Sequence, residues 1–309
     1  MKITPQILFR FAAQFLLAAF LAAVAGAQAQ ALKTDAGGLA SASQPLLWEV
    51  KGDKNSVFLL GSIHVARPDF YPLPAYVERA YLQADTLAVE VDPSASDVAA
   101  RMVPYLTYKA EDSLQKHVAP ATWQKLSARL GPSLEQMKSL KPAMLSVVMA
   151  VGLYADLGFN PDAGIDLHFL ARAKADKKSL VELESIEFQA AVLGGLSDQD
   201  GEAMLADVLD GFDNGEAVAY VRDLAKAWKA GDEKGLAEQL SKEAGKDPGS
   251  ARVMKLLIDD RNPEMANKIG RLFRDGRKVF VVIGAGHLVG DGSVVDLLRK
   301  QGLTVTQVK

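Results

Sequence analysis

Two apolar runs near opposite ends of the chain constrain its fold more than any other feature. Lys278–Ile283 reads KVFVVI and is the clearest candidate for a buried strand, and Ser56–Leu60 is a shorter run of the same kind. The other β-prone segments are Leu46–Val50, Thr86–Val91, Ser179–Leu183 and Leu303–Val308. We therefore predict an α/β fold, with a mixed sheet built from N- and C-terminal strands and a large helical insertion between them.

The insertion is a helical block over about residues 97–270, in which prolines separate the helices. Residues 142–157 are apolar nearly all round, which predicts a buried helix. Residues 281–308 have the pattern of a β-α-β unit, which favours parallel pairing of the last two strands. No segment repeats with a period of 20–50 residues, so we predict a single domain over 45–309.

The N-terminus has the three parts of a cleavable export signal. Lys2 and Arg10 precede an apolar run over 11–27, and the motif Ala27-Gln28-Ala29 follows at signal-peptidase spacing. A retained anchor is the alternative, but the run is shorter than the roughly 20 residues that span a bilayer. We predict a signal peptide over 1–29, a polar linker over 30–44 and a periplasmic or secreted protein without a transmembrane segment after cleavage.

Composition narrows the chemistry that is open to the chain. It contains no cysteine, which excludes disulfides, thiol nucleophiles and thiolate metal sites. The formal charge is −3, and losing Lys2 and Arg10 with the signal peptide makes it more negative. An acidic chain without a polybasic block argues against nucleic acid as a partner. We expect a peptide or small-molecule substrate instead. The sequence does not indicate the oligomeric state.

Two histidines share an unusual context. The motifs GSIH (61–64) and GAGH (284–287) each follow directly after an apolar strand candidate. The glycines Gly61, Gly284 and Gly286 permit sharp turns and close backbone approach to a ligand. Because α/β sheets present ligands at the carboxyl ends of their strands, His64 and His287 would meet if these strands are neighbours. They would then form a metal site or an acid–base pair; the alternative is that each histidine only satisfies its own turn.

Glu90 is the expected carboxylate partner of these histidines. It lies within the apolar segment AVEVD (88–92), where an ionised carboxylate is costly unless it is paired or bound to metal. The alternative is that Glu90 lies at an exposed strand end.

Together these motifs resemble the TraB/GumN family, which includes the Tiki-type metalloproteases and is distantly similar to erythromycin esterases and ChaN-like haem-binding proteins. The resemblance covers about 45–308 and also rests on Gly164-Ile165-Asp166, on ELES (182–185) with Gln189, and on LIDDRNPEM (257–265). It implies that His64, Glu90 and His287 form the polar core of the site. It further implies a divalent cation, Mn²⁺ or Co²⁺, as in the Tiki-type peptidases.

Four further polar residues are secondary candidates. Arg261 would bind a substrate carboxylate or orient Glu90 by charge-assisted hydrogen bonds. Asn262 precedes Pro263 and fits a helix N-cap, and Asp166 could also cap a helix or add a carboxylate to the site. Glu184 follows a strand candidate and could line the same cleft.

Three functions remain open at this point. The first is a metal-dependent hydrolase of an amide or ester bond, with the cation held by His64, Glu90 and His287. The second is a metal-free hydrolase, with His64 as general base and Glu90 as its partner. The third is a non-catalytic envelope protein that binds haem, metal or a peptide.

Overall fold

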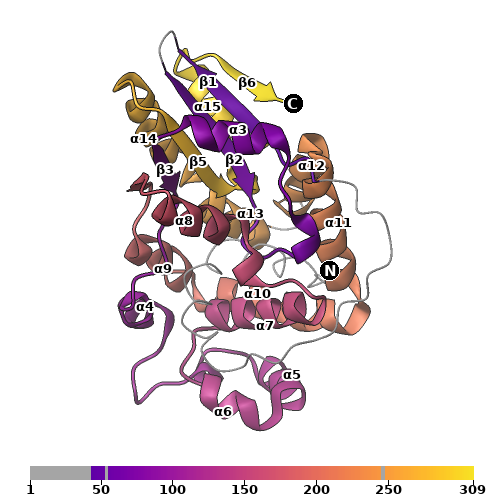
Figure 1. Ribbon diagram of the computed structural model, residues 1–309. Coiled ribbons are helices and arrows are strands. Elements are labelled where there is room, and N and C mark those ends of the chain that lie inside the picture. The colour runs from indigo at the N-terminus through magenta and orange to yellow at the C-terminus, as the bar shows by residue number, and fades with distance from the viewer. Residues whose placement is uncertain (1–42, 53–54, 245–247) are drawn as a thin grey trace.

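A six-stranded sheet draws strands from both ends of the chain (Figure 1). The computed structural model describes residues 43–52, 55–244 and 248–309. The strand order is β4-β3-β5-β2-β1-β6. The strands are β1 (Leu47–Lys51), β2 (Ser56–Ser62), β3 (Thr86–Val89), β4 (Ser179–Glu182), β5 (Val279–Gly284) and β6 (Val305–Val308). The predicted α/β fold, with a mixed sheet and a helical insertion, is confirmed.

The centre of the sheet is parallel. β5 pairs with β2 on one side and with β3 on the other, and β3 pairs with β4. β5 is buried along its whole length, which explains why its sequence is continuously apolar. The pairing sets Gly61 opposite Ile283 and Ser62 opposite Gly284, so the two strands end at the same edge of the sheet.

The prediction that the last two strands pair in parallel is wrong. Both edges of β5 are already occupied, by β2 and β3, and β1 folds back antiparallel onto the free edge of β2. β6 therefore pairs with an edge strand instead, and lies antiparallel to β1. Local sequence predicted the strand, whereas its partner depends on which edges the rest of the chain leaves open.

Helices cover both faces of the sheet. In Figure 1, α3 (Ala75–Gln83) and α8 (Ile165–Ala175) lie in front of the strands, and α15 (Val294–Lys300) lies behind them. α14 (Asn262–Arg274) packs against α15 and β2. A π-helical turn over Lys255–Asp259 precedes α14.

The remaining helices form the predicted block, whose α5 and α6 lie at the end of the molecule opposite the sheet (Figure 1). α7 packs against α10 and is buried on nearly all sides, as predicted for this apolar segment. The helices are α4 (Val98–Leu106), α5 (Pro120–Leu130), α6 (Leu134–Met137), α7 (Pro142–Asp156), α9 (Ile186–Gly194), α10 (Asp198–Asn214), α11 (Glu216–Ala230), α12 (Glu233–Ala244) and α13 (Pro248–Met254).

The predicted signal peptide (1–29) lies outside the described residues, as does the predicted linker except for its last two residues. Of these, Ser43 is buried and its hydroxyl donates to the carbonyl of Phe70 at 3.0 Å. Among the helices that the structure describes, none is long and apolar enough to cross a membrane.

Candidate functional site

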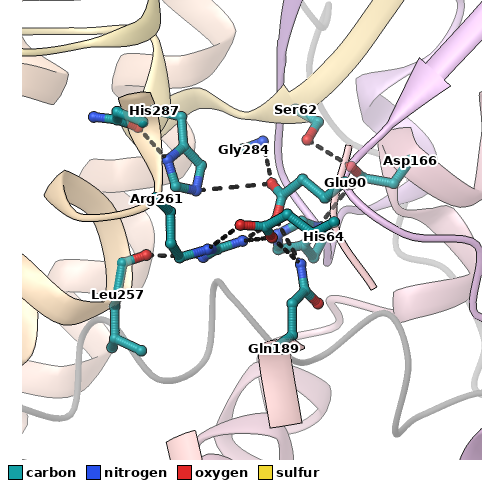
Figure 2. A network of polar contacts seen from close by, with 11 residues as sticks. Ser62, His64, Glu90, Asp166, Gln189, Leu257, Arg261, Gly284 and His287 are labelled. Carbon is teal, nitrogen blue, oxygen red and sulfur yellow. Dashed lines mark hydrogen bonds and ion pairs between the residues drawn. The ribbon is translucent and has the colours of Figure 1, made fainter. Parts of the chain in front are cut away.

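The two Gly-x-x-His turns meet at the edge of the sheet where β2 and β5 end. A methyl group added at Gly284 would lie 3.7 Å from His64 Nε2, 3.7 Å from His287 Cδ2 and 3.3 Å from Glu90 Oε1. Two atoms that each lie this close to one point are at most twice that distance apart. The structure therefore brings His64, Glu90 and His287 together around one glycine, as Figure 2 shows for the three side chains.

His64 is held by a carboxylate. Its Nδ1 lies 2.9 Å from Asp166 Oδ2, and the hydroxyl of Ser62 donates to Asp166 Oδ1 at 2.7 Å. Asp166 lies in the first turn of α8 but makes no capping hydrogen bond there. Its side chain is instead committed to the GSIH turn, so the helix-cap interpretation of Asp166 is wrong.

The start of α8 is pressed against this turn. The backbone N–H of Ile165 donates to the carbonyl of Ile63 at 3.1 Å. A Cβ at Gly164 would lie 2.3 Å from the carbonyl oxygen of His64, so only glycine fits here without a shift of the backbone. This close approach gives the Gly164-Ile165-Asp166 motif a physical reason, because it sets Asp166 beside the imidazole of His64.

His287 is held by an amide. Asn262 donates from Nδ2 to the carbonyl of Gly292 at 3.0 Å, which turns its Oδ1 toward His287 Nδ1 at 2.6 Å. Because Oδ1 can only accept, Nδ1 of His287 carries the proton and Nε2 carries the lone pair. Asn262 begins α14 but makes no capping hydrogen bond, so the N-cap interpretation of this residue is wrong as well.

Glu90 lies one residue beyond the end of β3, not inside the strand as predicted. Its Oε1 accepts from the backbone N–H of Gly284 at 2.8 Å. Its Oε2 accepts from Arg261 Nη2 at 2.7 Å and from Gln189 Nε2 at 3.1 Å. A carboxylate has about four lone-pair sites, so Oε1 keeps acceptor capacity on the side where His287 Nε2 lies 4.0 Å away.

Arg261 bridges two carboxylates, those of Glu90 and Glu184, and Figure 2 shows it beside Glu90. It donates to Glu184 from Nε at 2.9 Å and from Nη2 at 2.5 Å, and the same Nη2 also reaches Glu90. Its Nη1 donates at 2.8 Å to the carbonyl of Leu257, which belongs to the π-helical turn. Only 3% of the Arg261 side chain is exposed. One buried cation therefore offsets two buried carboxylates, which leaves the cluster with a negative surplus.

The two histidines titrate in opposite directions. Burial lowers the pKa of His64, but the charge and hydrogen bond of Asp166 outweigh it, and the net pKa is raised. Burial lowers the pKa of His287 too, the Arg261 cation lowers it further, and the net pKa lies well below the ordinary value. His287 is therefore a neutral imidazole near pH 7, whereas His64 readily holds a second proton.

The donor chemistry of the site suits a first-row divalent cation. Imidazole nitrogens and a carboxylate oxygen are its ordinary ligands, and each Nδ1 here is already bound to an oxygen acceptor, as in most metal-ligating histidines. Within the described ranges, however, no group of three His, Asp or Glu side chains is already spaced to hold a metal ion. A cation would require these side chains to close in on it.

An apolar pocket, here called the inner pocket, opens beside His64. Its other walls include Ile63, Leu224 of α11, Leu236 and Leu240 of α12, and Gly286. Neither these leucines nor Ser62 were among the site residues predicted from the sequence. Ser62 lies within the GSIH motif, which was a usable signal, whereas the leucines have ordinary amphipathic spacing and nothing marks them as part of a site.

These features define an α/β protein with a buried His/Glu/Arg cluster at the carboxyl ends of two parallel strands. The sequence profile of the TraB/PrgY/gumN family matches residues 46–307, and the chain belongs to this family.

Among curated proteins, the chain is 29% identical to the Escherichia coli (strain K12) "Uncharacterized protein YbaP" over 244 residues, which is 78% of this chain and 87% of YbaP. It is 24% identical to human "Metalloprotease TIKI1" over 314 residues, 84% of this chain and 61% of TIKI1. An uncharacterized protein of Treponema pallidum is 22% identical over 285 residues, 86% of this chain and 83% of that protein. No solved structure matches the chain.

Proposed function

We propose that this protein is an exported, metal-dependent hydrolase that cleaves an amide or ester bond in a peptide or small molecule. The observation that carries the proposal is the convergence of His64, Glu90 and His287 around Gly284, with each imidazole fixed through Nδ1. The similarity to proteins named metalloproteases supports the same reaction class.

In this proposal His64, His287 and Glu90 hold one divalent cation, Mn²⁺ or Co²⁺. When bound, such a cation lowers the pKa of a water molecule and polarises a substrate carbonyl. Asn262 keeps the lone pair of His287 on Nε2, and Asp166 does the same for His64 once its second proton has left. Arg261 and Gln189 fix the orientation of Glu90, and a carboxylate of the Glu90–Glu184 pair would accept the proton of the attacking water.

The test is hydrolysis by purified protein of a panel of peptides and simple esters, with added Mn²⁺ or Co²⁺ and with EDTA. We expect turnover that requires the cation and is lost in His64→Ala and in His287→Ala. His117→Ala is the matched control, because His117 lies outside the site and is bound by Asp112 and Asp198. Full turnover in EDTA would exclude the metal, and turnover that survives in both site variants would exclude the site.

One observation favours a second candidate, a metal-free hydrolase. The pair of His64 and Asp166 has the geometry of a general base and its orienting carboxylate, and it needs no third ligand. Asp166, and not Glu90 as predicted from the sequence, is the carboxylate that orients His64. Turnover that persists without metal but disappears in both His64→Ala and Asp166→Ala would identify this mechanism.

The export signal predicted over residues 1–29 indicates where in the cell the protein would act. We propose that the mature protein acts in the periplasm or outside the cell, on substrates of the envelope. Immunoblotting of periplasmic and cytoplasmic fractions for a full-length chain and for one lacking residues 2–29 tests this. Retention of the full-length chain in the cytoplasm would contradict it.

A further inference from the structure

The side chains of the site are almost fully covered. The exposed fraction is at most 7% for each of its four central residues, which are His64, Glu90, Arg261 and His287. The inner pocket beside His64 has a volume of about 20 Å³, which is about the space of one water molecule. A peptide or ester group is larger than that, so a substrate reaches His64 only after an element that covers it has moved.

Helix α12 forms one wall of the inner pocket. Its Leu236 and Leu240 line the pocket, and a Cβ at Gly286 in the second histidine turn would lie 3.8 Å from both Cδ atoms of Leu240. The opposite face of the helix carries Lys234 and Glu238, which are exposed. A single helix therefore separates this side of the pocket from solvent.

The neighbouring wall, α11, is anchored by polar contacts. Trp228 Nε1 donates at 2.8 Å to the carbonyl of Gly61, in the first histidine turn. Lys229 Nζ lies 3.0 Å from Asp69 Oδ2. Both contacts are long-range, and they hold the end of α11 in place beside the site.

Helix α12 has no such anchor over its described side chains, residues 233–241. The ion pair of Lys234 with Glu238 lies within the helix, and the Asp232 carboxylate accepts from the backbone N–H of Gly235 at the helix start. No hydrogen bond or ion pair joins these side chains to another element in the part of the chain that the structure describes. Apolar contacts alone therefore hold this face of α12 against the pocket.

The flank of α12 is also incompletely packed. A groove of about 440 Å³ lies between α12, the π-helical turn and the loop over 286–291. A segment with few buried apolar contacts and no long-range polar contact opens at a low free-energy cost, and active-site lids are drawn from such segments. Of the two helices that wall the inner pocket, α12 is therefore the one that can move.

We propose that α12 is a lid of the site, closed in this structure, and that a substrate reaches His64 when α12 lifts away from Gly286 and Gly290. This rests on the proposed hydrolytic function and deepens it, because it assigns the step that admits the substrate. When the lid closes again, Leu236 and Leu240 exclude water from the reacting atoms.

A disulfide can hold the lid shut, because the chain has no cysteine of its own. A Cβ at Gly290 would lie 3.9 Å from Ala237 Cβ, close to the mean of about 3.8 Å for disulfides. Gly290 has a φ of +82°, which strains any other residue there. The oxidised and reduced forms of Ala237→Cys/Gly290→Cys share this strain, so the difference between them reports the lock alone.

Access to His64 can be measured apart from hydrolysis with diethyl pyrocarbonate, which modifies a free imidazole nitrogen. Nε2 of His64 has no hydrogen-bond partner among the described residues and is buried, so it reacts only when the site opens. Metal-free protein would be labelled, and peptide mass spectrometry would give the rate at His64. We expect the rate in the oxidised double variant to be at least about 10-fold lower than in the reduced one. His168 of α8 is the internal reference, with the same rate in both forms.

A second variant tests the lid without a disulfide. Leu236→Ala removes the buried side chain by which α12 closes the pocket, and we expect His64 to be labelled roughly 10-fold faster than in wild type. Leu82→Ala is the matched control, because Leu82 is a 67% exposed leucine of α3 and its loss should leave the rate unchanged.

Equal labelling of His64 in the oxidised and reduced double variant would overturn the proposal, as would equal labelling of Leu236→Ala and wild type. Turnover with Mn²⁺, followed in parallel, separates this result from failure of the proposed function. Labelling that responds to the lock, without turnover by wild type, would support the lid and contradict the hydrolase. Turnover that the lock leaves intact would support the hydrolase and contradict the lid.

Discussion

The two Gly-x-x-His turns begin alike and end in different chemistry. Both follow the central parallel strands β2 and β5, and both deliver an imidazole to the same edge of the sheet. His64 is bound by a carboxylate and has a raised pKa, whereas His287 is bound by an amide and has a pKa well below the ordinary value. The repeated motif thus sets where each ring lies, whereas the surroundings set its pKa: Asp166 outweighs burial at His64, and burial together with the Arg261 cation lowers the pKa of His287.

The largest expected effect comes from Arg261, whose guanidinium binds both Glu90 and Glu184. Arg261→Met leaves Glu90 and Glu184 buried without their cation, and losing one partner of a buried ion pair costs about 3–5 kcal/mol. Urea unfolding should register this loss. Arg271→Met is the control, because that arginine is 58% exposed and its removal should change stability by less than about 0.5 kcal/mol. Equal stability of the two variants would show that the buried contacts of Arg261 do not stabilise the fold.

The second prediction tests whether His64 needs a carboxylate partner, where His287 has the amide of Asn262. Asp166→Asn gives the first turn an amide, like that of the second. We expect metal affinity and turnover to fall by about 10- to 100-fold, the usual effect of changing the group behind a ligating imidazole. Asp162→Asn is the control, because Asp162 lies just before α8 without contacting His64. Turnover unchanged in Asp166→Asn would remove Asp166 from the mechanism.

A smaller effect is expected at the glycine that separates the rings. The Cβ of Gly284→Ala would lie 3.3 Å from Glu90 Oε1, and we expect a destabilisation of about 1 kcal/mol, the low end for overpacking, because one carboxylate oxygen must move. Gly152→Ala is the matched control. No atom lies within 4 Å of its added methyl group, and alanine in a helix should stabilise α7. Equal shifts in thermal midpoint would contradict the crowding at Gly284.

The smallest effect concerns a histidine outside both turns. Burial lowers the pKa of His117, but Asp112 and Asp198 bind both ring nitrogens and raise it on balance above 6.5. Because the folded pKa exceeds the unfolded one, this histidine stabilises the fold below pH 6.5 and loses that contribution as pH rises through the folded value. Thermal midpoints of wild type and His117→Gln should differ more at pH 5.5 than at pH 9. A difference that grows with pH would contradict the assignment.

The positions of the strands and of the two histidine turns could be predicted from local sequence. All six strands were found within a few residues of their positions, because apolar runs bounded by turns are strong signals. The two histidine turns were found for the same reason. The strand pairing that brings them together is also consistent with the sequence, since β2 and β5 are the two most continuously apolar strands.

The side chains that bind the two histidines could not be predicted from local sequence, because they lie far away along the chain. Asp166 lies 102 residues from His64, and Asn262 lies 25 residues from His287. Each lies beside a helix start, where capping is the more frequent role, so Asn262 was interpreted as a cap and Asp166 was left open between a cap and a carboxylate of the site. The leucines of α11 and α12 at the inner pocket carry no mark in the sequence, because the same spacing describes any buried helix face.

The metal content of the purified protein decides whether the two histidine turns share a cation. Wild type, His64→Ala, His287→Ala and the control His117→Ala would each be dialysed against Mn²⁺ or Co²⁺ and analysed by inductively coupled plasma mass spectrometry. We expect one bound cation per chain in wild type and in His117→Ala, and a loss of that cation in both site variants. Equal metal in all four proteins, or none in wild type, would contradict a cation shared between the two turns.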